Sequence, residues 1–566
     1  MTNIIFCAYD DSIMYIRTTA RKNKDGSRVE YLQLAHNYWD PVKKRPRPKV
    51  IANLGRKDRL DLDRIRDMIR ALSKLLPANE AAEITAMIEA SGLPFKVNWA
   101  KSAGGIYFLR KLWNSFGLKE FFEKKLKERR FEIPVEVAIF AMVAGRALAP
   151  DSKLSTYQWI KEEVYFPEGQ GLELHHFYRA MDFLVEVGEG LEKEIFKRVA
   201  NLFNLRVDLI FFDTTSVYFE TEVEDSLRKR GYSRDRRPDL PQVVVGLAVT
   251  REGIPVKAWV FPGDTPDVKA AFRVQEELRS FSVGRIIWVC DRGMVSEETR
   301  VVFQRAGGGY ILGERLRSGS EMVEEVLATG GRYREVRDNL WVKEVRVKRG
   351  TKERRYVLVY NPERAARDKA IREEILKALE QEIERIKGLS GLRRQRAECR
   401  LRRSPVLRRF LAADSLKIER EKVKREERLD GKYLLSTTEE DLSAEEVALS
   451  YRNLQEVERA FRELKHRFDI RPMYHRLEER IRGHVMLCWL ALLMGRLVEL
   501  KVGESFSRIR RKLGRICVVE LEYTREDQKE KVYRWTEIEP RVKGIFKKLG
   551  VNLPQAYEFK FSARSK

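Results

Sequence analysis

Hydrophobic residues recur at helical spacing in residues 451–465, YRNLQEVERAFRELK. The apolar positions that form and continue this pattern are Leu454, Val457, Phe461, Leu464 and Phe468. Intervals of three and four residues predict a helix that buries one apolar stripe.

A second stripe of this predicted helix is polar. Tyr451, Glu458 and Lys465 lie seven residues apart, which is nearly two turns at about 3.6 residues per turn. Arg462 follows Glu458 by one turn. A Glu–Arg pair at this spacing is ordinary on a solvated surface, so the pair alone indicates no function. Beside a buried stripe, however, this row could hold a metal-binding carboxylate among side chains that grip phosphate.

The N-terminal region alternates between apolar and polar residues in the manner of strands, and two amphipathic helices follow. The predicted strands cover residues 14–17, 31–34 and 49–55, and the predicted helices cover 60–76 and 81–90. A basic, proline-broken loop at residues 40–48 separates the last two strands; a solubilising loop and a basic DNA-contacting tip explain it equally well. We assign residues 1–95 to an N-terminal β-rich and helical DNA-binding region.

Helical periodicity dominates residues 96–205, which we assign to a helical domain. The predicted helices cover residues 105–116, 134–148, 155–160, 175–187 and 192–203. The pattern changes at residue 206 to short apolar strands with intervening helices. The predicted strands cover 207–212, 217–221, 242–250, 256–261, 285–290 and 310–312, with helices at 267–281 and 296–305. Such an order predicts one mixed α/β unit.

Residues 320–445 interrupt this α/β unit and form a predicted insertion domain. It contains strand patterns at 341–347 and 355–359 and a long charged helix at 362–387. A solvated insertion explains most of this segment, but the very basic run 393–409 favours an arm that faces DNA. The core, whose first part is 206–319, resumes at 446–500 with the helix that carries Glu458, and 501–566 form a C-terminal region.

Two predicted strands of the core are each followed by an aspartate, Asp213 and Asp291. Either residue alone would more often form a turn. Two carboxylates at the ends of adjacent strands repel each other unless a cation lies between them, and ligands that are all oxygen suit Mg²⁺ or Mn²⁺. Glu458 on a helix packed against the sheet could complete this site. Two metal ions held in this way could promote in-line displacement at a phosphodiester.

The charge of the chain favours a polyanionic partner. Lysine and arginine number 111, aspartate and glutamate 86, and the formal net charge is +25. Nucleic acid is the first candidate, although proteins that bind ribosomes or anionic lipids share this property. An acidic pocket within a basic protein is what an enzyme acting on DNA requires.

Cysteine usage and hydrophobicity exclude other classes. Five cysteines without a CxxC motif argue against a zinc site or a disulfide framework and favour a reducing compartment. No signal peptide is predicted at the N-terminus. The longest apolar run, residues 485–500, is interrupted by Arg496 and is too short for a membrane span, so we expect a buried helix there.

The order Asp213, Asp291, Glu458, in an α/β unit interrupted before its last helix, resembles the DDE transposases of bacterial insertion sequences. Residues 451–465 resemble the Y-R-E-K signature of the insertion-sequence-four family, with Leu454 at the position of the arginine. The DRGM sequence around Asp291 is similar to the motif of the second acid. Residues 231–242 (GYSRDRRPDLPQ) and 470–475 (IRPMYH) resemble one branch of this family.

This resemblance implies an RNase H-like core and cut-and-paste DNA transposition. A metal-activated water would cut double-stranded DNA at the terminal inverted repeats, and the freed 3′-hydroxyl would attack target DNA. Asp213, Asp291 and Glu458 would be the catalytic ligands of two Mg²⁺ or Mn²⁺ ions. The DNA-binding residues would be Tyr451, Lys465, Arg462 and Arg292. The resemblance further implies a homodimer in a synaptic complex, an insertion that holds the cleaved ends, a cytoplasmic, nucleoid-associated location and no membrane partner.

Two other functions fit the same residues. An RNase H-like nuclease or resolvase would cut DNA without joining it, and a non-catalytic relative would bind DNA only. The three acids argue against the second of these.

Overall fold

The computed structural model describes residues 14–22, 28–40, 45–57, 96–127, 129, 131–203, 209–279, 286–304, 308–318, 320–349, 352–525, 528–555 and 557–560. The chain divides into two compact units. The first consists of residues 1–97, 521–531 and 560–566, and the second of residues 98–520 and 532–559.

An antiparallel three-stranded sheet forms the described N-terminal part of the first unit. Its strands are β1 (Met14–Lys22), β2 (Arg28–Asp40) and β3 (Arg45–Arg56), in the order β1-β2-β3. The prediction of a small sheet is confirmed, but residues 45–48 belong to β3 and not to the predicted loop. Pro46 and Pro48 are tolerated there because β3 is an edge strand of this sheet, where a missing N–H need not break the ladder. The helices predicted at 60–76 and 81–90 lie outside the described residues.

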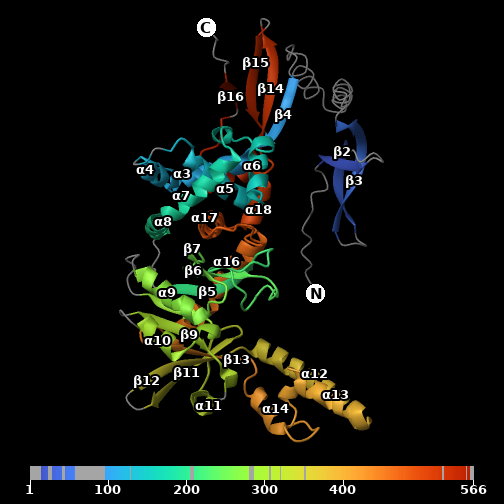
Figure 1. Ribbon diagram of the computed structural model, residues 1–566, viewed down its shortest axis with the longest axis vertical. Coiled ribbons are helices and arrows are strands. Elements are labelled where there is room, and N and C mark those ends of the chain that lie inside the picture. The colour runs from blue at the N-terminus through green and yellow to red at the C-terminus, as the bar shows by residue number, and fades with distance from the viewer. Residues whose placement is uncertain are drawn as a thin grey trace. The chain divides into compact units, whose positions relative to one another are not determined.

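A layer of amphipathic helices begins the second unit, as predicted (Figure 1). The helices are α3 (Gly104–Ser115), α4 (Leu118–Leu126), α5 (Val135–Leu148), α6 (Lys153–Glu162), α7 (Leu174–Glu186) and α8 (Gly188–Phe203). Their buried faces share one core, in which the rings of Trp113 and Phe122 stack with their centroids 5.8 Å apart.

A nine-stranded mixed sheet forms the centre of the second unit, in the order β10-β11-β12-β13-β9-β8-β5-β6-β7. The strands β5 (Leu209–Tyr218), β6 (Gln242–Val249) and β7 (Pro255–Pro262) form an antiparallel meander. Next, β8 (Ile287–Cys290) runs parallel to β5, and β9 (Gly309–Glu314) runs parallel to β8. A meander followed by two parallel strands is the arrangement of an RNase H-like core, so the predicted mixed α/β fold class is confirmed.

Four strands in the described part of residues 320–445 continue this sheet, and two of them, β11 and β12, match the strands predicted at 341–347 and 355–359. These strands are β10 (Arg334–Arg337), β11 (Leu340–Arg349), β12 (Lys352–Tyr360) and β13 (Lys432–Thr437). Antiparallel pairing of β13 with β9, from Leu434 opposite Glu314 to Thr437 opposite Ile311, joins them to the core. The short helix α11 (Glu321–Ala328) covers β11 through Val323 and Val326.

Helices cover both faces of the core sheet. On one face lie α9 (Asp267–Arg279) and α10 (Glu297–Gln304), where the rings of Trp288 and Phe303 stack at 5.1 Å. On the other face, α16 (Gln455–His466) packs against β5 and β6, while α15 (Ala444–Arg452) packs against β9 and β11.

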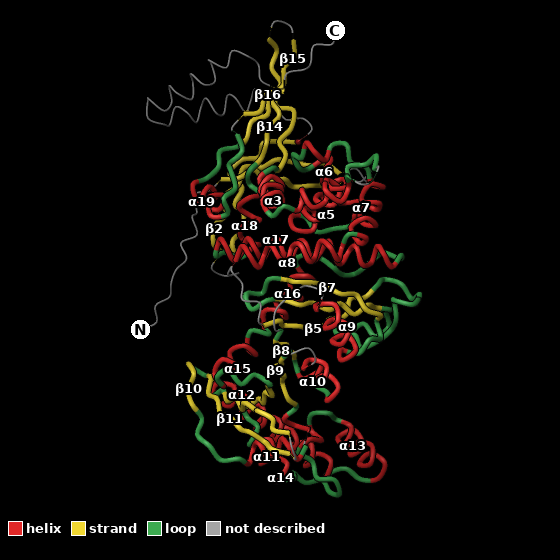
Figure 2. Tube along the Cα trace, turned by 90° about the vertical axis from the view of Figure 1, so that its left-hand side faces the viewer, coloured by secondary structure: helices red, strands yellow, loops and turns green. Residues whose placement is uncertain are grey.

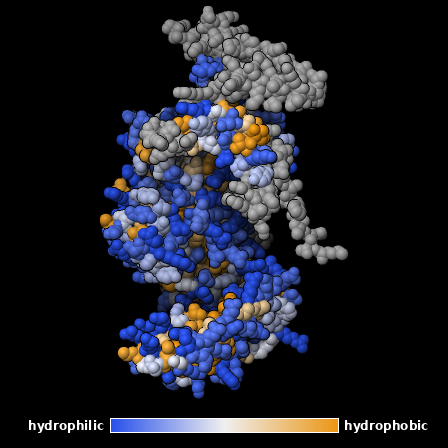
Figure 3. Space-filling view, turned by 90° about the vertical axis from the view of Figure 1, so that its right-hand side faces the viewer, coloured by the Kyte–Doolittle hydropathy of each residue, from blue (hydrophilic) through white to orange (hydrophobic). Residues whose placement is uncertain are grey.

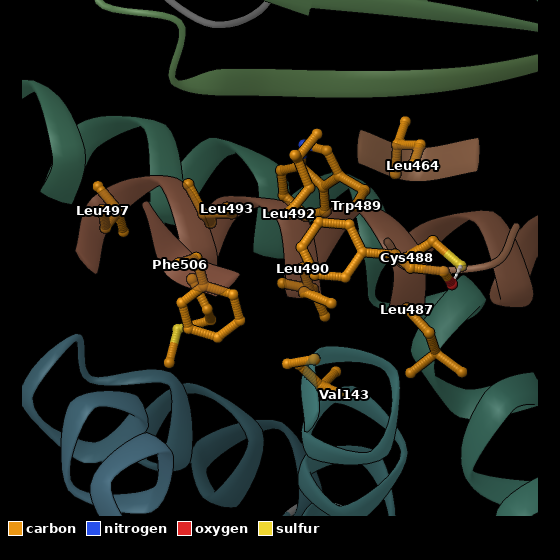
Figure 4. Packing of buried hydrophobic residues seen from close by; sticks show 14 of the residues in the cluster. Val143, Leu464, Leu487, Cys488, Trp489, Leu490, Leu492, Leu493, Leu497 and Phe506 are labelled. Atoms are coloured by element: carbon orange, nitrogen blue, oxygen red, sulfur yellow. Dashed lines mark hydrogen bonds between the residues drawn. The ribbon is translucent and has the colours of Figure 1, made fainter. Parts of the chain in front are cut away.

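A long apolar helix, α17 (Glu478–Val502), lies between the helical layer and the sheet (Figure 2). It packs against α5 and α7 on one side and β7 on the other. Figure 4 shows Leu490 directed toward Val143 of α5, while Trp489 projects from the opposite side of the helix. Because both sides are covered, the helix is hydrophobic all round, which explains the apolar run at 485–500. Within the part of the chain that the structure describes, no helix could cross a membrane.

Three helices of residues 320–445 stand apart from the sheet as an arm (Figure 1). They are α12 (Pro362–Lys387), α13 (Gly391–Arg403) and α14 (Arg420–Glu427). A small core of their own includes Leu379, Ile383, Leu401 and Phe410. The arm begins and ends at one point, where the Asn361 N–H donates to the Gly431 carbonyl at 2.8 Å.

The C-terminal region returns to the helical layer. Its elements are α18 (Phe506–Leu513), β14 (Cys517–Arg525), β15 (Gln528–Trp535), α19 (Pro540–Lys548) and β16 (Tyr557–Lys560). A four-stranded sheet in the order β16-β15-β14-β4 includes β4 (Lys96–Ser102) from before the helical layer.

A buried group of bases lies where α6 and α17 meet residues 469–477. Lys153 Nζ is 3.4 Å from His484 Nδ1, and His484 Nε2 is 3.4 Å from the Ile470 carbonyl. These contacts fit a neutral imidazole whose Nε2–H donates and whose Nδ1 accepts. Burial, reinforced by Arg146 and Lys153, lowers the pKa of His484 well below its usual value. Burial also lowers the pKa of Lys153 to about 7 and of His475 to about 3.

We expect acid to weaken this packing. Between pH 6.5 and the lowered pKa values, the unfolded chain protonates His475 and His484 while the folded protein does not. The free energy of unfolding should therefore fall by about 1.4 kcal/mol per pH unit for each histidine. Urea unfolding followed by tryptophan fluorescence at pH 7 and pH 5 measures the total change, to which the raised pKa values of Asp213 and Glu192 contribute with the opposite sign, so the histidine contribution is taken from the difference between wild type and variant. His484→Gln removes one titrating group, so the free energy of unfolding should fall by about 1.4 kcal/mol less per pH unit than in the wild type. An unchanged pH dependence would contradict the role of His484.

Candidate catalytic site

Parallel pairing of β5 with β8 brings two of the candidate acids to the same level of the sheet. Phe211 lies opposite Val289, and Asp213 and Asp291 each follow two residues later. Neighbouring strands are about 4.8 Å apart. One expectation is wrong: β5 continues to Tyr218, so Asp213 lies within the strand rather than at its end. The strand continues because residues 213–218 keep pairing with β6.

Crowding of carboxylates shapes the electrostatics around Asp213. Its Oδ1 accepts the backbone N–H of Thr214 at 2.7 Å. The pKa of Asp213 is raised to about 6, chiefly by burial; Asp267 and Asp291 contribute to this increase, while Arg234 and the Thr214 N–H oppose it. Uncompensated negative charge on oxygen ligands is the condition that a divalent cation relieves. Oxygen ligands of this kind suit Mg²⁺ or Mn²⁺, but the carboxylate oxygens of Asp213, Asp291 and Glu458 do not all lie within 4.8 Å of one another in this structure.

Tyr451, on the last turn of α15, holds the second acid. Its hydroxyl donates to Asp291 Oδ1 at 2.8 Å. Burial raises the pKa of Tyr451, and Asp291 adds to this effect, so the phenol remains a donor at neutral pH. Gly313 on β9 makes room for this contact, since a Cβ atom there would lie 2.2 Å from the Tyr451 oxygen. Sequence analysis did not identify Gly313 because its partner is distant in the chain.

The helix expected at 451–465 is broken in two. The helix α15 ends at Arg452 and α16 begins at Gln455, so Tyr451 and Glu458 do not share a helix as predicted. Leu454 occupies the N-cap position of α16, and its side chain is buried in the core.

A cavity of about 680 Å³ brings the second and third acids together. Asp291, Tyr451 and Glu458 line it, and the exposed Glu458 carboxylate faces this space from α16. Basic residues surround these acids: Arg292, Arg315, Arg317, Arg364, Lys432 and Arg452. The cavity thus combines carboxylates with a cationic rim, as required to hold metal ions and a phosphate backbone together.

Lys465 lies away from this cavity. Its side chain is only 11% exposed, and Nζ lies 2.8 Å from Asp235 Oδ1. Arg471 Nη1 approaches the same oxygen at 3.2 Å. In this structure Lys465 links α16 to the loop of residues 231–241 through Asp235, and it does not line the cavity of Asp291 and Glu458.

Arg462 lines a different cavity, of about 620 Å³, near the end of α5. Arg459, Arg467, Arg510 and His466 line the same space. Burial, with Arg467 and Arg511, lowers the pKa of Arg510. This accumulation of positive charge forms a second basic surface, separate from the candidate acids.

A fourth acid, Asp267, was not identified from the sequence. It begins α9, accepts the Thr214 hydroxyl, and receives Arg234 Nη2 at 2.9 Å. Arg234 Nη1 also donates to Thr214 Oγ1 at 2.7 Å. From the sequence, an aspartate here reads as an ordinary first-turn residue; its closeness to Asp213 becomes visible only in the folded sheet.

Among the described residues, the group of potential ligands whose atoms all lie within 4.8 Å of one another is at the start of α7 and consists of Glu173, His175 and His176. Helix capping explains this group. His176 Nδ1 accepts the Glu173 N–H at 3.1 Å, and the two residues form a capping box.

Comparisons with known proteins place these residues in context. A family model described as the transposase DDE domain matches residues 208–494, which include all three candidate acids. A model described as the N-terminal domain of IS1634 family transposases matches residues 16–83. The search of curated proteins gives no match. Among solved structures, the chain is similar to the cryo-EM structure of the piggyBac transposase synaptic complex with hairpin DNA. That similarity has 10% identity, covers 73% of this chain and 78% of that chain, and has a TM-score of 0.34.

We expect the contact between Gly313 and Tyr451 to be sensitive to one added methyl group. Gly313→Ala should lower the free energy of unfolding by about 1–3 kcal/mol through overpacking. Tyr451→Phe removes the nearest atom, so the double variant should lose less than the sum of the single variants. Urea unfolding measures each value. Gly330→Ala is the matched control, because a Cβ atom at Gly330 meets open space. Strict additivity would contradict the contact.

We also expect Asp235 to matter more for stability than Lys465. Asp235→Asn leaves two cations facing a neutral amide at a site that is 4% exposed, and should cost about 3 kcal/mol. Lys465→Met should cost less, because Arg471 still neutralises Asp235. Urea unfolding compares the two variants, with the exposed Asp239→Asn as a neutral control in the same loop. A larger loss for Lys465→Met than for Asp235→Asn would disprove this order.

Proposed function

We propose that this protein, which belongs to the DDE transposase family, cuts and joins DNA with the carboxylates of Asp213, Asp291 and Glu458. The observation that carries this proposal is the crowding of acids beside a cationic cavity. Asp213 has a raised pKa next to Asp291, while Asp291 and Glu458 line one cavity with six basic side chains.

The three carboxylates are the proposed ligands of two divalent cations, Mg²⁺ or Mn²⁺. When bound, such ions supply positive charge at the phosphate and an activated water. The chain holds each carboxylate in place. The Thr214 N–H fixes Asp213, the Tyr451 hydroxyl fixes Asp291, and α16 presents Glu458 to the cavity.

Arginines at the rim are the proposed contacts to the DNA backbone. Arg292 follows Asp291 directly, and Arg315 and Arg317 line the same cavity from the segment after β9. Arg462 would extend the contact through the second basic surface, and the basic α13 would do so through the arm. Hydrophilic side chains dominate the described surface in the view of Figure 3.

We place the chain near the insertion-sequence-four family within the DDE transposases. Its signature arginine is replaced by Leu454, which is buried. Arg452 is exposed and lines the cavity, whereas Arg462 lines the other one. Arg452 is therefore the proposed substitute for the missing phosphate contact.

The proposed reaction is cut-and-paste transposition by a homodimer. Cleavage at the terminal inverted repeats would release a 3′-hydroxyl, which would then attack target DNA. A plasmid that carries the coding sequence with its native flanking DNA supplies both ends for an assay. A pre-cleaved end with a free 3′-hydroxyl should be joined to a target plasmid; cleavage without joining would favour a nuclease or resolvase.

Neutralising any one candidate acid should abolish metal-dependent cleavage. Asp213→Asn, Asp291→Asn and Glu458→Gln each remove a negative ligand, and the rate with Mg²⁺ should fall more than about 100-fold. Gel assays measure cleavage, and fluorescence anisotropy should show DNA binding nearly unchanged. Glu479→Gln, an exposed acid on α17, should retain full activity. Retained cleavage in any of the three variants would remove that residue from the proposed site.

A further inference from the structure

The loop at residues 231–241 is held rigidly against the sheet. A Cβ atom at Gly231 would lie 2.2 Å from the Gly263 carbonyl oxygen, so two backbones meet there without side chains. Gln242 Nε2 donates to the carbonyls of Tyr232 and Gly263 at 3.1 and 3.0 Å. The backbone on both sides of Tyr232 is therefore fixed by β6 and the end of β7.

Two further contacts anchor the same loop. The Arg234 N–H donates to Ser216 Oγ on β5 at 2.8 Å. Asp235 pairs with Lys465 on α16, as described above. A loop fixed by β5, β6 and α16 holds its side chains in one place at little further entropic cost.

Tyr232 is nevertheless 86% exposed. Tyr232 lines a cavity of about 350 Å³ together with Thr214, Ser216, Arg234 and Asp267. Thr214 directly follows Asp213, and Arg234 is the cation that lowers the pKa of Asp213. An exposed aromatic ring on a rigid loop thus lies at the rim of a polar cavity next to a candidate catalytic acid.

We propose that this cavity is a nucleotide subsite, in which one unpaired base of the DNA strand stacks on Tyr232. This inference rests on the proposed action on DNA. An aromatic platform suits any base, because every base has a π-face. The volume is at the lower end of the range for small-molecule pockets, as expected for a single nucleoside. Thr214 and Ser216 also line the cavity, where their hydroxyls hold Asp267 and Arg234 in place.

Arg234 is the proposed contact to the adjoining phosphate. Its side chain is 31% exposed while Nη1 and Nη2 bind Thr214 and Asp267. A guanidinium has five N–H donors, so donors remain for a phosphate oxygen. Because Arg234 also faces Asp213, this contact would connect the seated nucleotide to the candidate metal site.

A base can reach Tyr232 only after it leaves the duplex stack. The protein should therefore bind a duplex with a short single-stranded overhang more tightly than the same duplex with blunt ends. Fluorescence anisotropy with labelled duplexes measures both affinities at one fixed salt concentration. A chelator prevents cleavage, and the full-length chain is used.

Tyr232→Ala should weaken binding of the overhang duplex by about 5- to 100-fold while leaving binding of the blunt duplex unchanged. Tyr232→Phe and Tyr232→Trp should retain the preference, because each keeps a stacking ring. Tyr474→Ala is the matched control, since Tyr474 is 72% exposed and lies on residues 470–477. A fluorescent adenine analogue in the overhang should be quenched by the wild type and not by Tyr232→Ala.

The outcomes separate this inference from the function on which it rests. If the wild type binds both duplexes equally, or if Tyr232→Ala keeps the preference and the quenching, the subsite is disproved while the proposed action on DNA stands. An equal loss in Tyr474→Ala would also overturn it, because any exposed tyrosine would then serve. If the wild type binds neither duplex, the proposed function fails and the subsite with it.

Discussion

The burial of an aspartate close to other carboxylates is the constraint around which the candidate site is arranged. The pairing of β5 with β8 places Asp213 beside Asp291, and α9 adds Asp267. Neighbouring groups moderate the repulsion between these carboxylates without removing it. Arg234 lies beside Asp213, and Tyr451 donates to Asp291. The folded chain thus carries a local excess of negative charge that a divalent cation would relieve, although the protein as a whole is strongly basic.

Rigid packing keeps this strained arrangement in place. The sheet is backed by α17, which is buried between β7 and the helical layer. The helix α16 lies between α17 and the strands β5 and β6, so Glu458 is presented from a well-packed element. A site composed of like charges needs such support, because it contributes little stability of its own in the absence of a cation.

Elements with a strong local pattern could be predicted from the sequence. The helix at 362–387 was predicted to the residue, since Asn361 caps it, Pro362 begins it and a glycine follows it. The order of strands and helices also sufficed for the fold class. The break at 453–454 could not be predicted, because Leu454 continues the apolar spacing of α16 and no proline or glycine marks the turn.

Some residues of the candidate site could likewise be predicted from the sequence, and others could not. Asp213, Asp291 and Glu458 carried a signal because they follow apolar strands or lie on an amphipathic helix. The structure brings Asp291 and Glu458 into one cavity and places Asp213 beside Asp291. Gly313 and Asp267 could not be predicted as site residues from the sequence. Gly313 is needed because a side chain there would clash with Tyr451, and Asp267 contacts Thr214 and Arg234, which are distant in the chain. Lys465 and Arg462 matched a periodicity, yet they face Asp235 and a separate basic surface.

The closed base of the α12–α14 arm has an evolutionary consequence. The chain leaves β12 and re-enters β13, which are hydrogen-bonded neighbours, and Asn361 and Gly431 meet where it does so. An inserted segment of any length could begin and end there without changing the register of the paired strands. The arm can therefore be exchanged, lengthened or lost between relatives as a self-contained unit, while the end of the sheet that carries the candidate acids stays the same.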